Sequence, residues 1–121
     1  MEWTRAPSVA GMFYPEHEGT LRTEVEAMLA GASGAGTDPA PKAVIAPHAG
    51  YIYSGPIAAS AYARLRTQAG IISRVVLLGP AHRLPVRGLA ASSAQAFLTP
   101  LGPVTLDREG IAGALELPQV Q

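Results

Sequence analysis

The sequence contains no cysteine, which excludes disulfides, thiolate metal sites and cysteine nucleophiles within these residues. Charge is also scarce: only 15% of the residues are charged, and nine basic residues balance nine acidic ones. Lys42 is the only lysine, and no basic patch or arginine stripe of the kind that binds nucleic acid stands out. We therefore expect no nucleic-acid partner.

Long apolar runs are missing as well. The longest run is far shorter than the roughly 20 residues that a membrane helix needs. The N-terminus, MEWTRAPSVAG, lacks the charged segment followed by an apolar segment that marks a signal peptide. We expect a cytoplasmic protein without a membrane partner. No Walker loop, G-x-S-x-G elbow or H-E-x-x-H motif is present either. The sequence therefore lacks the motifs that mark P-loop nucleotide-binding proteins, α/β-hydrolases and zinc metalloproteases.

The composition that remains is that of a folded α/β protein. The chain has 121 residues, of which 48% are hydrophobic, enough for one domain with a packed core. Residues 18–30 carry apolar side chains at helical spacing, with Thr20 as a cap. Residues 54–66 also predict a helix, capped by Ser54 and with Pro56 in its first turn. Residues 31–41 predict a loop.

Two unbroken apolar runs, KAVIA at 42–46 and SRVVLLG at 73–79, predict buried strands. Because a helical segment lies between them, they predict a βαβ unit with parallel strands and a right-handed crossover. Residues 88–93 and 103–106 predict further strands, and Asp107 predicts the start of a short helix that runs to residue 115.

Two histidines follow the two predicted strands in matching positions. His48 lies two residues after the first strand and His82 three residues after the second, each close behind a proline. Ligands of open parallel sheets gather at the carboxyl ends of the strands, and neighbouring strands lie about 4.8 Å apart. We expect both imidazoles at one crevice, where they could share a metal ion. The alternative is that each histidine is structural or simply solvated.

Other residues near this crevice have two interpretations each. Tyr53 could line the crevice or fill the core, and Arg83 could bind a carboxylate or be solvated. Asp107 could be a third metal ligand, although a helix cap explains it more simply. Ser54 would place helix amides beside a bound anion. His17, in the polar stretch PEHEG, is expected to be solvated.

Four stretches of the sequence are informative together: RAPSVAGMFYP (5–15), KAVIAPHAGYIYSGPIAASAY (42–62), RVVLLGPAHR (74–83) and TPLGPVTLD (99–107). They resemble the Memo family, whose members are Memo-like proteins, also called AmmeMemoRadiSam system protein B. They occur in the family's order, and the resemblance covers nearly all of the chain. The resemblance implies that residues 1–121 are one partial domain from the N-terminal part of a Memo-like protein, incomplete at its C-terminus, because the family's proteins are more than twice as long.

The resemblance implies a three-layer α/β/α fold with a largely parallel central sheet, similar to class III extradiol dioxygenases. It implies that His48 and His82 are metal-site positions and that Phe13 and Tyr53 line the same pocket. The implied cofactor is Fe(II) or Cu, with the remaining ligand outside this chain. In bacteria the implied partners are a radical-SAM protein and an AMMECR1-like protein.

Three functions therefore remain open on the sequence. The first is a metal-binding redox or dioxygenase-like protein that acts on a small molecule, and whether it is an enzyme does not follow from the resemblance. The second is a non-catalytic module that binds an anionic ligand or a peptide through Tyr53, Ser54 and Arg83. The third is an inactive truncated product that self-associates through an exposed sheet edge.

Overall fold

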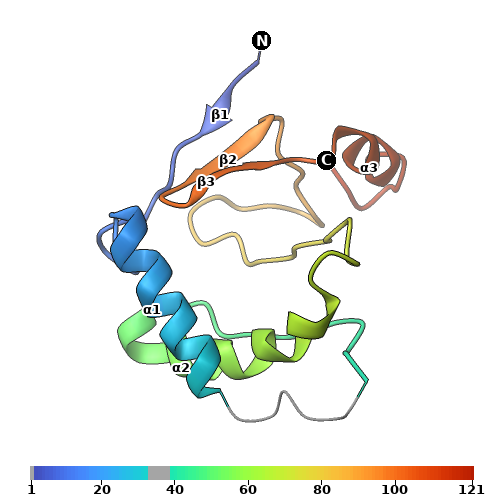
Figure 1. Cartoon of the computed structure of the whole chain (residues 1–121). Coiled ribbons are helices and arrows are strands. Elements are labelled where there is room, and N and C mark those ends of the chain that lie inside the picture. The colour runs from blue at the N-terminus through green and yellow to red at the C-terminus, as the bar shows by residue number, and fades with distance from the viewer. Residues whose placement is uncertain (1, 33–38) are drawn as a thin grey trace. The chain divides into compact units, whose positions relative to one another are not determined.

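A computed structural model describes residues 2–32 and 39–121, which form a small α/β structure (Figure 1). Two compact units are present: Met1–Ala6, Arg74–Leu98 and Pro103–Gln121 form the first, and Pro7–Ser73 with Thr99–Gly102 form the second. None of the described helices is both long and apolar enough to cross a membrane. The elements in chain order are β1 (Thr4–Arg5), α1 (Glu18–Gly31), α2 (Tyr51–Tyr62), the 3₁₀ helix η1 (Ala63–Gln68), β2 (Ala96–Thr99), β3 (Gly102–Thr105) and α3 (Arg108–Ala114).

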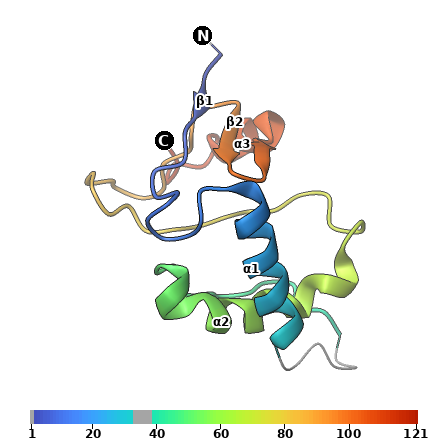
Figure 2. The same cartoon turned by 60° about the vertical axis from the view of Figure 1, so that its left-hand side comes forward.

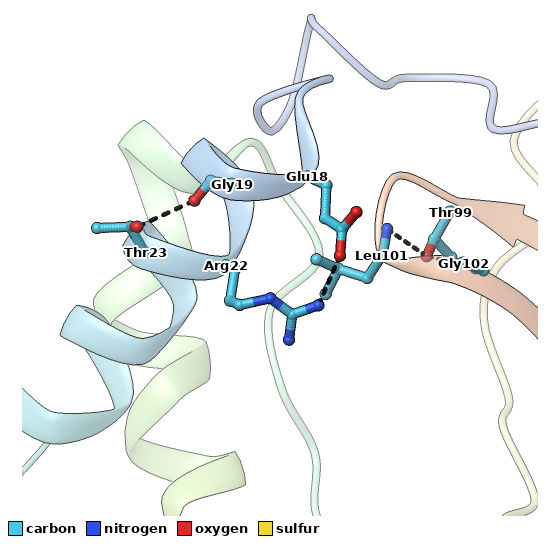
Figure 3. A network of polar contacts seen from close by, with 7 residues as sticks. All are labelled: Glu18, Gly19, Arg22, Thr23, Thr99, Leu101 and Gly102. Atoms are coloured by element: carbon cyan, nitrogen blue, oxygen red, sulfur yellow. Dashed lines mark hydrogen bonds and ion pairs between the residues drawn. The ribbon is translucent and has the colours of Figure 1, made fainter.

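Helix α1 of the second unit confirms the prediction for residues 18–30. Its cap is His17, whose carbonyl accepts a hydrogen bond from the Leu21 amide at 3.0 Å, so the prediction of Thr20 as cap is wrong. Glu18, in the first turn, suits the positive end of the helix dipole. It also accepts a hydrogen bond of 2.9 Å from Arg22 one turn later, as Figure 3 shows.

Helix α2 begins at Tyr51, three residues earlier than predicted, and Gly50 is its cap. The prediction relied on Pro56, which is favoured in the first turn of a helix because it has no amide hydrogen to donate. Here Pro56 lies inside the helix instead, one turn further along. Ser54 is therefore not a cap; it is buried, and its hydroxyl donates to the Ala49 carbonyl at 3.2 Å.

Helices α1 and α2 pack against each other in the second unit, as both views show (Figures 1 and 2). Leu21, Ala59 and Ala63 are the buried apolar side chains there. At Gly55 a Cβ atom would lie 2.6 Å from Met28 Sδ, so the absence of a side chain allows the two helices to approach closely.

The sheet has three strands in the order β1-β2-β3. Strand β1 pairs in parallel with β2 through Thr4↔Ala96 and Arg5↔Phe97, and β2 continues into β3 through a hairpin. At the hairpin tip the Thr99 hydroxyl donates to the Gly102 carbonyl at 2.8 Å and accepts from the Leu101 amide at 3.1 Å (Figure 3). The predicted strand at 103–106 is thus confirmed as β3, whereas β1 and β2 were not predicted.

Helix α3 of the first unit confirms the prediction that Asp107 is a helix cap. Its Oδ1 accepts from the Gly110 amide at 2.9 Å, and its Oδ2 forms an ion pair with Arg74 Nε. The next residue, Arg108, reaches back to the Ser92 and Ala94 carbonyls at 3.0 and 3.2 Å. The Asp107 carboxylate therefore links the first turn of α3 to Arg74.

The predicted strand at 88–93 is reduced to a single bridge between Leu89 and Val120. The Leu89 amide donates to Gln119, and the Gln121 amide donates back to Leu89. Gly88 precedes this bridge with a φ of 74°, and a Cβ atom there would collide with the Gln119 carbonyl oxygen. Glycine is required at this position for both reasons.

The strands predicted at 42–46 and 73–79 are not formed in this structure. Ile45 is 98% exposed and Val76 82%, so these apolar runs lie at the surface. A strand needs a neighbour for its backbone hydrogen bonds, and the described residues provide none for these two runs. The predicted βαβ unit is therefore not formed, and the large predicted core is limited to Leu21 and four alanines among the described residues.

The two roles of Asp107 can be separated by substitution. Asp107→Asn keeps a capping side chain but removes the ion pair with Arg74, and exposed pairs of this kind contribute roughly 0–1 kcal/mol. Asp107→Ala removes both, and we expect it to lower the free energy of unfolding by about a further 1 kcal/mol. Urea denaturation followed by circular dichroism measures both. Equal stability of the two variants would contradict a capping role.

Candidate functional site

A cavity of about 480 Å³ lies within the second unit, between α1, α2 and two loops. Its walls are mainly apolar, and the polar side chains among the lining residues are His48, Ser54 and the tyrosines at 14, 51 and 62. A cavity of this size and character matches small-molecule sites in proteins. The walls are formed by Val9, Phe13 and Tyr14; by Val25, Met28 and Leu29 of α1; by Pro47, His48 and Ala49; and by Tyr51, Ser54, Gly55, Ala58, Ala59 and Tyr62 of α2.

The first wall is a tight turn over residues 9–14. Gly11 has a φ of 79°, and its amide donates to the Tyr14 carbonyl at 2.8 Å. The Phe13 amide donates to the Val9 carbonyl at 2.9 Å, and the Phe13 carbonyl accepts from the Tyr51 amide at 2.8 Å. The last bond fixes the turn to the first residue of α2.

Two tyrosines meet where this turn joins the helix. The ring centroids of Tyr14 and Tyr51 are 5.7 Å apart, with the planes tilted by 40°. Burial raises the pKa of the Tyr51 phenol above its usual value of 10.0, and the neighbouring Tyr14, Glu24 and Tyr62 raise it further. Tyr51 therefore keeps its proton at neutral pH and can act as a hydrogen-bond donor at the cavity.

Three of the residues predicted from the sequence line this one cavity: Phe13, His48 and Ser54. Phe13 is 43% exposed, His48 lies at the exposed rim, and Ser54 is buried. The hydrogen bond from Ser54 to Ala49 links the His48 loop to α2. His48 is thus an exposed residue at the edge of a mainly apolar cavity.

The remaining predicted residues lie elsewhere. Tyr53 is 83% exposed and is not among the residues that line the cavity. His82 and Arg83 are exposed residues of the first unit, whereas His48 belongs to the second. A crevice shared by the two histidines therefore stays a prediction.

The start of the second helix, where an anion site is expected, lies at a different residue from the one predicted. The helix starts at Tyr51 and not at Ser54, and the amides of both residues already donate to backbone carbonyls, those of Phe13 and Gly50. The amides of Tyr51 and Ser54 are therefore not unpaired donors, and an anion site at this helix start stays a prediction.

A complete metal site is not formed by the described residues. Among residues 2–32 and 39–121, no group of three or more His, Cys, Asp or Glu side chains is placed to hold a metal ion. Asp107, the candidate third ligand, serves as the cap of α3 and pairs with Arg74. A protein metal centre with open positions usually has three protein ligands, so these residues alone do not fit one.

Sequence reasoning missed Tyr14 and Met28 as cavity residues. Met28 is one of the apolar side chains whose helical spacing predicts the helix over residues 18–30, and it lines the cavity. The helical spacing could not reveal that the space in front of this side chain remains open. Tyr14 carried no periodic signal, because it lies in an irregular segment held by local hydrogen bonds.

The raised pKa of Tyr51 predicts a specific dependence of stability on pH. The unfolded chain loses the Tyr51 proton near pH 10, while the folded chain still holds it. The stabilising contribution is complete below that pH and is lost as the pH rises through the folded-state pKa. We expect the free energy of unfolding to fall above about pH 10, and Tyr51→Phe to remove part of that fall.

Urea denaturation at a series of pH values between about 8 and 11 measures this effect. Tyr53→Phe is the matched control, because it makes the same chemical change at an exposed position of the same helix turn. An unchanged pH dependence in Tyr51→Phe would show that burial of Tyr51 has no such effect.

Comparison with known proteins adds to this geometry. The sequence profile of the family described as Memo-like protein matches residues 5–118. A MEMO1 family protein of Methanothermobacter thermautotrophicus is 42% identical over 111 residues, which cover 87% of this chain and 40% of the relative. A MEMO1 family protein of Aquifex aeolicus is 38% identical over 109 residues, covering 87% of this chain and 37% of the relative.

Similarity extends to an animal protein. Protein MEMO1 of Danio rerio is 38% identical over 105 residues, with 87% of this chain and 34% of that protein covered. The chain thus spans about two fifths or less of the length of these curated relatives. Because the family profile covers almost all of the chain, the chain belongs to the Memo-like protein family.

Proposed function

We propose that this chain supplies two histidine ligands, His48 and His82, to a redox metal centre of a Memo-like protein. The observation that carries the proposal is the position of His48 at the rim of an apolar cavity in a member of this family. Imidazole binds Fe and Cu well, and a third ligand would come from outside the described residues. When bound, such an ion would supply redox chemistry with oxygen.

The residues of the chain itself have a distinct part in this proposal. Phe13, Met28 and Tyr51 offer apolar surface that would hold the apolar part of a small molecule and exclude water beside His48. The protonated phenol of Tyr51 would orient a polar substituent by donating a hydrogen bond. The apolar walls favour such a ligand over an anion.

The proposal also includes a specific fold for the whole protein. A three-layer α/β/α arrangement similar to class III extradiol dioxygenases would turn the segments before His48 and His82 into neighbouring strands. Both imidazoles would then lie at the carboxyl edge of one sheet. The proposal includes radical-SAM and AMMECR1-like partners, which the family resemblance implies.

Metal binding by the purified chain tests the role of the two histidines. Because residues 1–121 contribute two of three ligands, we expect weak binding of Fe(II) or Cu(II) that gel filtration removes. His48→Ala and His82→Ala should each weaken this binding by about tenfold or more. Equilibrium dialysis with metal analysis measures the affinity.

The control is His17→Ala, which removes an exposed imidazole at the start of α1 and should leave the affinity unchanged. Metal retained in stoichiometric amounts after gel filtration, and equally in His48→Ala, would contradict the proposed ligand set. Equal losses in His17→Ala and His82→Ala would indicate nonspecific binding to surface histidines.

A further inference from the structure

Tyr14 and Tyr51 bring together two phenol side chains from distant parts of the sequence. Their ring centroids are 5.7 Å apart, with the ring planes tilted by 40°. Tyr14 also contributes to the raised pKa of Tyr51, so the two phenol groups interact as well as the two rings. Both residues belong to the second unit, and both are partly exposed. A reagent in solution can therefore reach the pair.

The backbone holds this pair in place. The Tyr51 amide donates to the carbonyl of Phe13, the residue before Tyr14, at 2.8 Å. The Tyr14 carbonyl accepts from the Gly11 amide, also at 2.8 Å, which closes the turn that carries Tyr14. The two side chains thus extend from backbone segments that are bonded to each other. Groups held together in this way react with each other at a high effective concentration.

The cavity gives the two rings room to move. Both rings line this space of about 480 Å³. Coupling of two tyrosines joins the ring carbons next to the two hydroxyl groups, so the rings must turn and approach each other before a bond can form. Side chains that border open space make such movements readily, whereas close packing on every side would oppose them.

We propose that Tyr14 and Tyr51 are a modification site, at which a one-electron oxidant such as an oxidised transition-metal complex forms a dityrosine cross-link. Each phenol gives one electron to the oxidant and one proton to solvent, which leaves two phenoxyl radicals. The radicals couple through a carbon–carbon bond between the ring positions next to the hydroxyl groups. The hydrogen on each bonded carbon then moves through solvent to the oxygen of its ring, which restores both phenols. The link therefore consumes two oxidising equivalents and releases two protons.

The other two tyrosines fit a link within the chain less well. Tyr53 is 83% exposed, and residues two positions apart on a helix do not face each other, so Tyr53 is suited to coupling between molecules. Tyr62 lines the same cavity but lies at the opposite end of α2 from Tyr51, about 16 Å away along the helix axis. It also raises the pKa of Tyr51 less than Tyr14 does.

A link between residues 14 and 51 would fasten the 9–14 turn to α2 covalently, beside the cavity. It would constrain the unfolded chain in the way that a disulfide across the same loop does. The oxidant comes from solution, so the link does not require a metal ion at His48. The experiment is therefore done without bound metal, and its outcome is independent of the proposed function.

The test is oxidation of the purified chain by photochemically generated ruthenium(III) trisbipyridyl, with persulfate to regenerate the oxidant. We expect a monomeric product with dityrosine fluorescence. After proteolysis, mass spectrometry should identify two peptides joined through Tyr14 and Tyr51, together lighter by two hydrogen atoms than the separate peptides. In denaturing urea we expect the yield of this pair to fall by about tenfold or more, because the two residues are no longer held together.

Single substitutions identify the partners. Tyr14→Phe and Tyr51→Phe each remove one phenol and keep the ring, and we expect each to lower the yield of monomeric dityrosine by about tenfold or more. Tyr53→Phe and Tyr62→Phe are the matched controls, which make the same chemical change and should leave this yield unchanged. Circular dichroism before oxidation verifies that each variant is folded.

An undiminished yield of monomeric dityrosine in the folded Tyr14→Phe variant would overturn the proposal, as would a main product that joins Tyr51 to Tyr62. Equal yields of the Tyr14–Tyr51 pair in native buffer and in urea would show that the fold does not direct the coupling. Cross-links between molecules alone, through Tyr53, would overturn the proposal as well.

Discussion

The hydrogen bond from the Tyr51 amide to the Phe13 carbonyl determines how the second unit is built. It joins residues that are 38 positions apart and attaches the 9–14 turn to the first residue of α2 at 2.8 Å. Gly50, beside it, is buried, and a Cβ atom there would lie 3.6 Å from Phe13 Cα, within ordinary contact distance. The loop that carries His48 enters the helix at this same point, so the position of the imidazole depends on this junction.

Small side chains explain why a cavity remains between α1 and α2. Gly55, Ala58 and Ala59 line one wall, and Gly55 allows Met28 to approach closely at one point. Such residues bring helices together but contribute little apolar area. Full burial of Leu21 contributes about 1.5–3 kcal/mol, and an alanine contributes less. The second unit is therefore held together largely by local hydrogen bonds and helix contacts, with an unfilled space between the helices.

The sequence predicted those features that depend on neighbouring residues. Helical periodicity located α1, and Asp107 was identified correctly as a cap because capping needs only the next three residues. The strands predicted at 42–46 and 73–79 are not formed. Strand pairing needs a partner that is distant in the sequence, and apolar composition does not reveal whether such a partner is present. Phe13, His48 and Ser54 were predicted and line one cavity, whereas Tyr14 lies in an irregular turn that has no periodic signal.

The unpaired apolar runs bear directly on the proposed metal centre. Each histidine follows an apolar run by two or three residues, so the position of its imidazole depends on where that run is held. An unpaired segment has many conformations, and a ligand placed at its end shares that freedom. Pairing the runs in a sheet would fix both ends and reduce the entropy that metal binding must overcome. If the two runs pair in a sheet, as proposed above, the backbone that completes this sheet would also position His48 and His82, so the sheet would have to assemble before the proposed ligands reach a precise geometry.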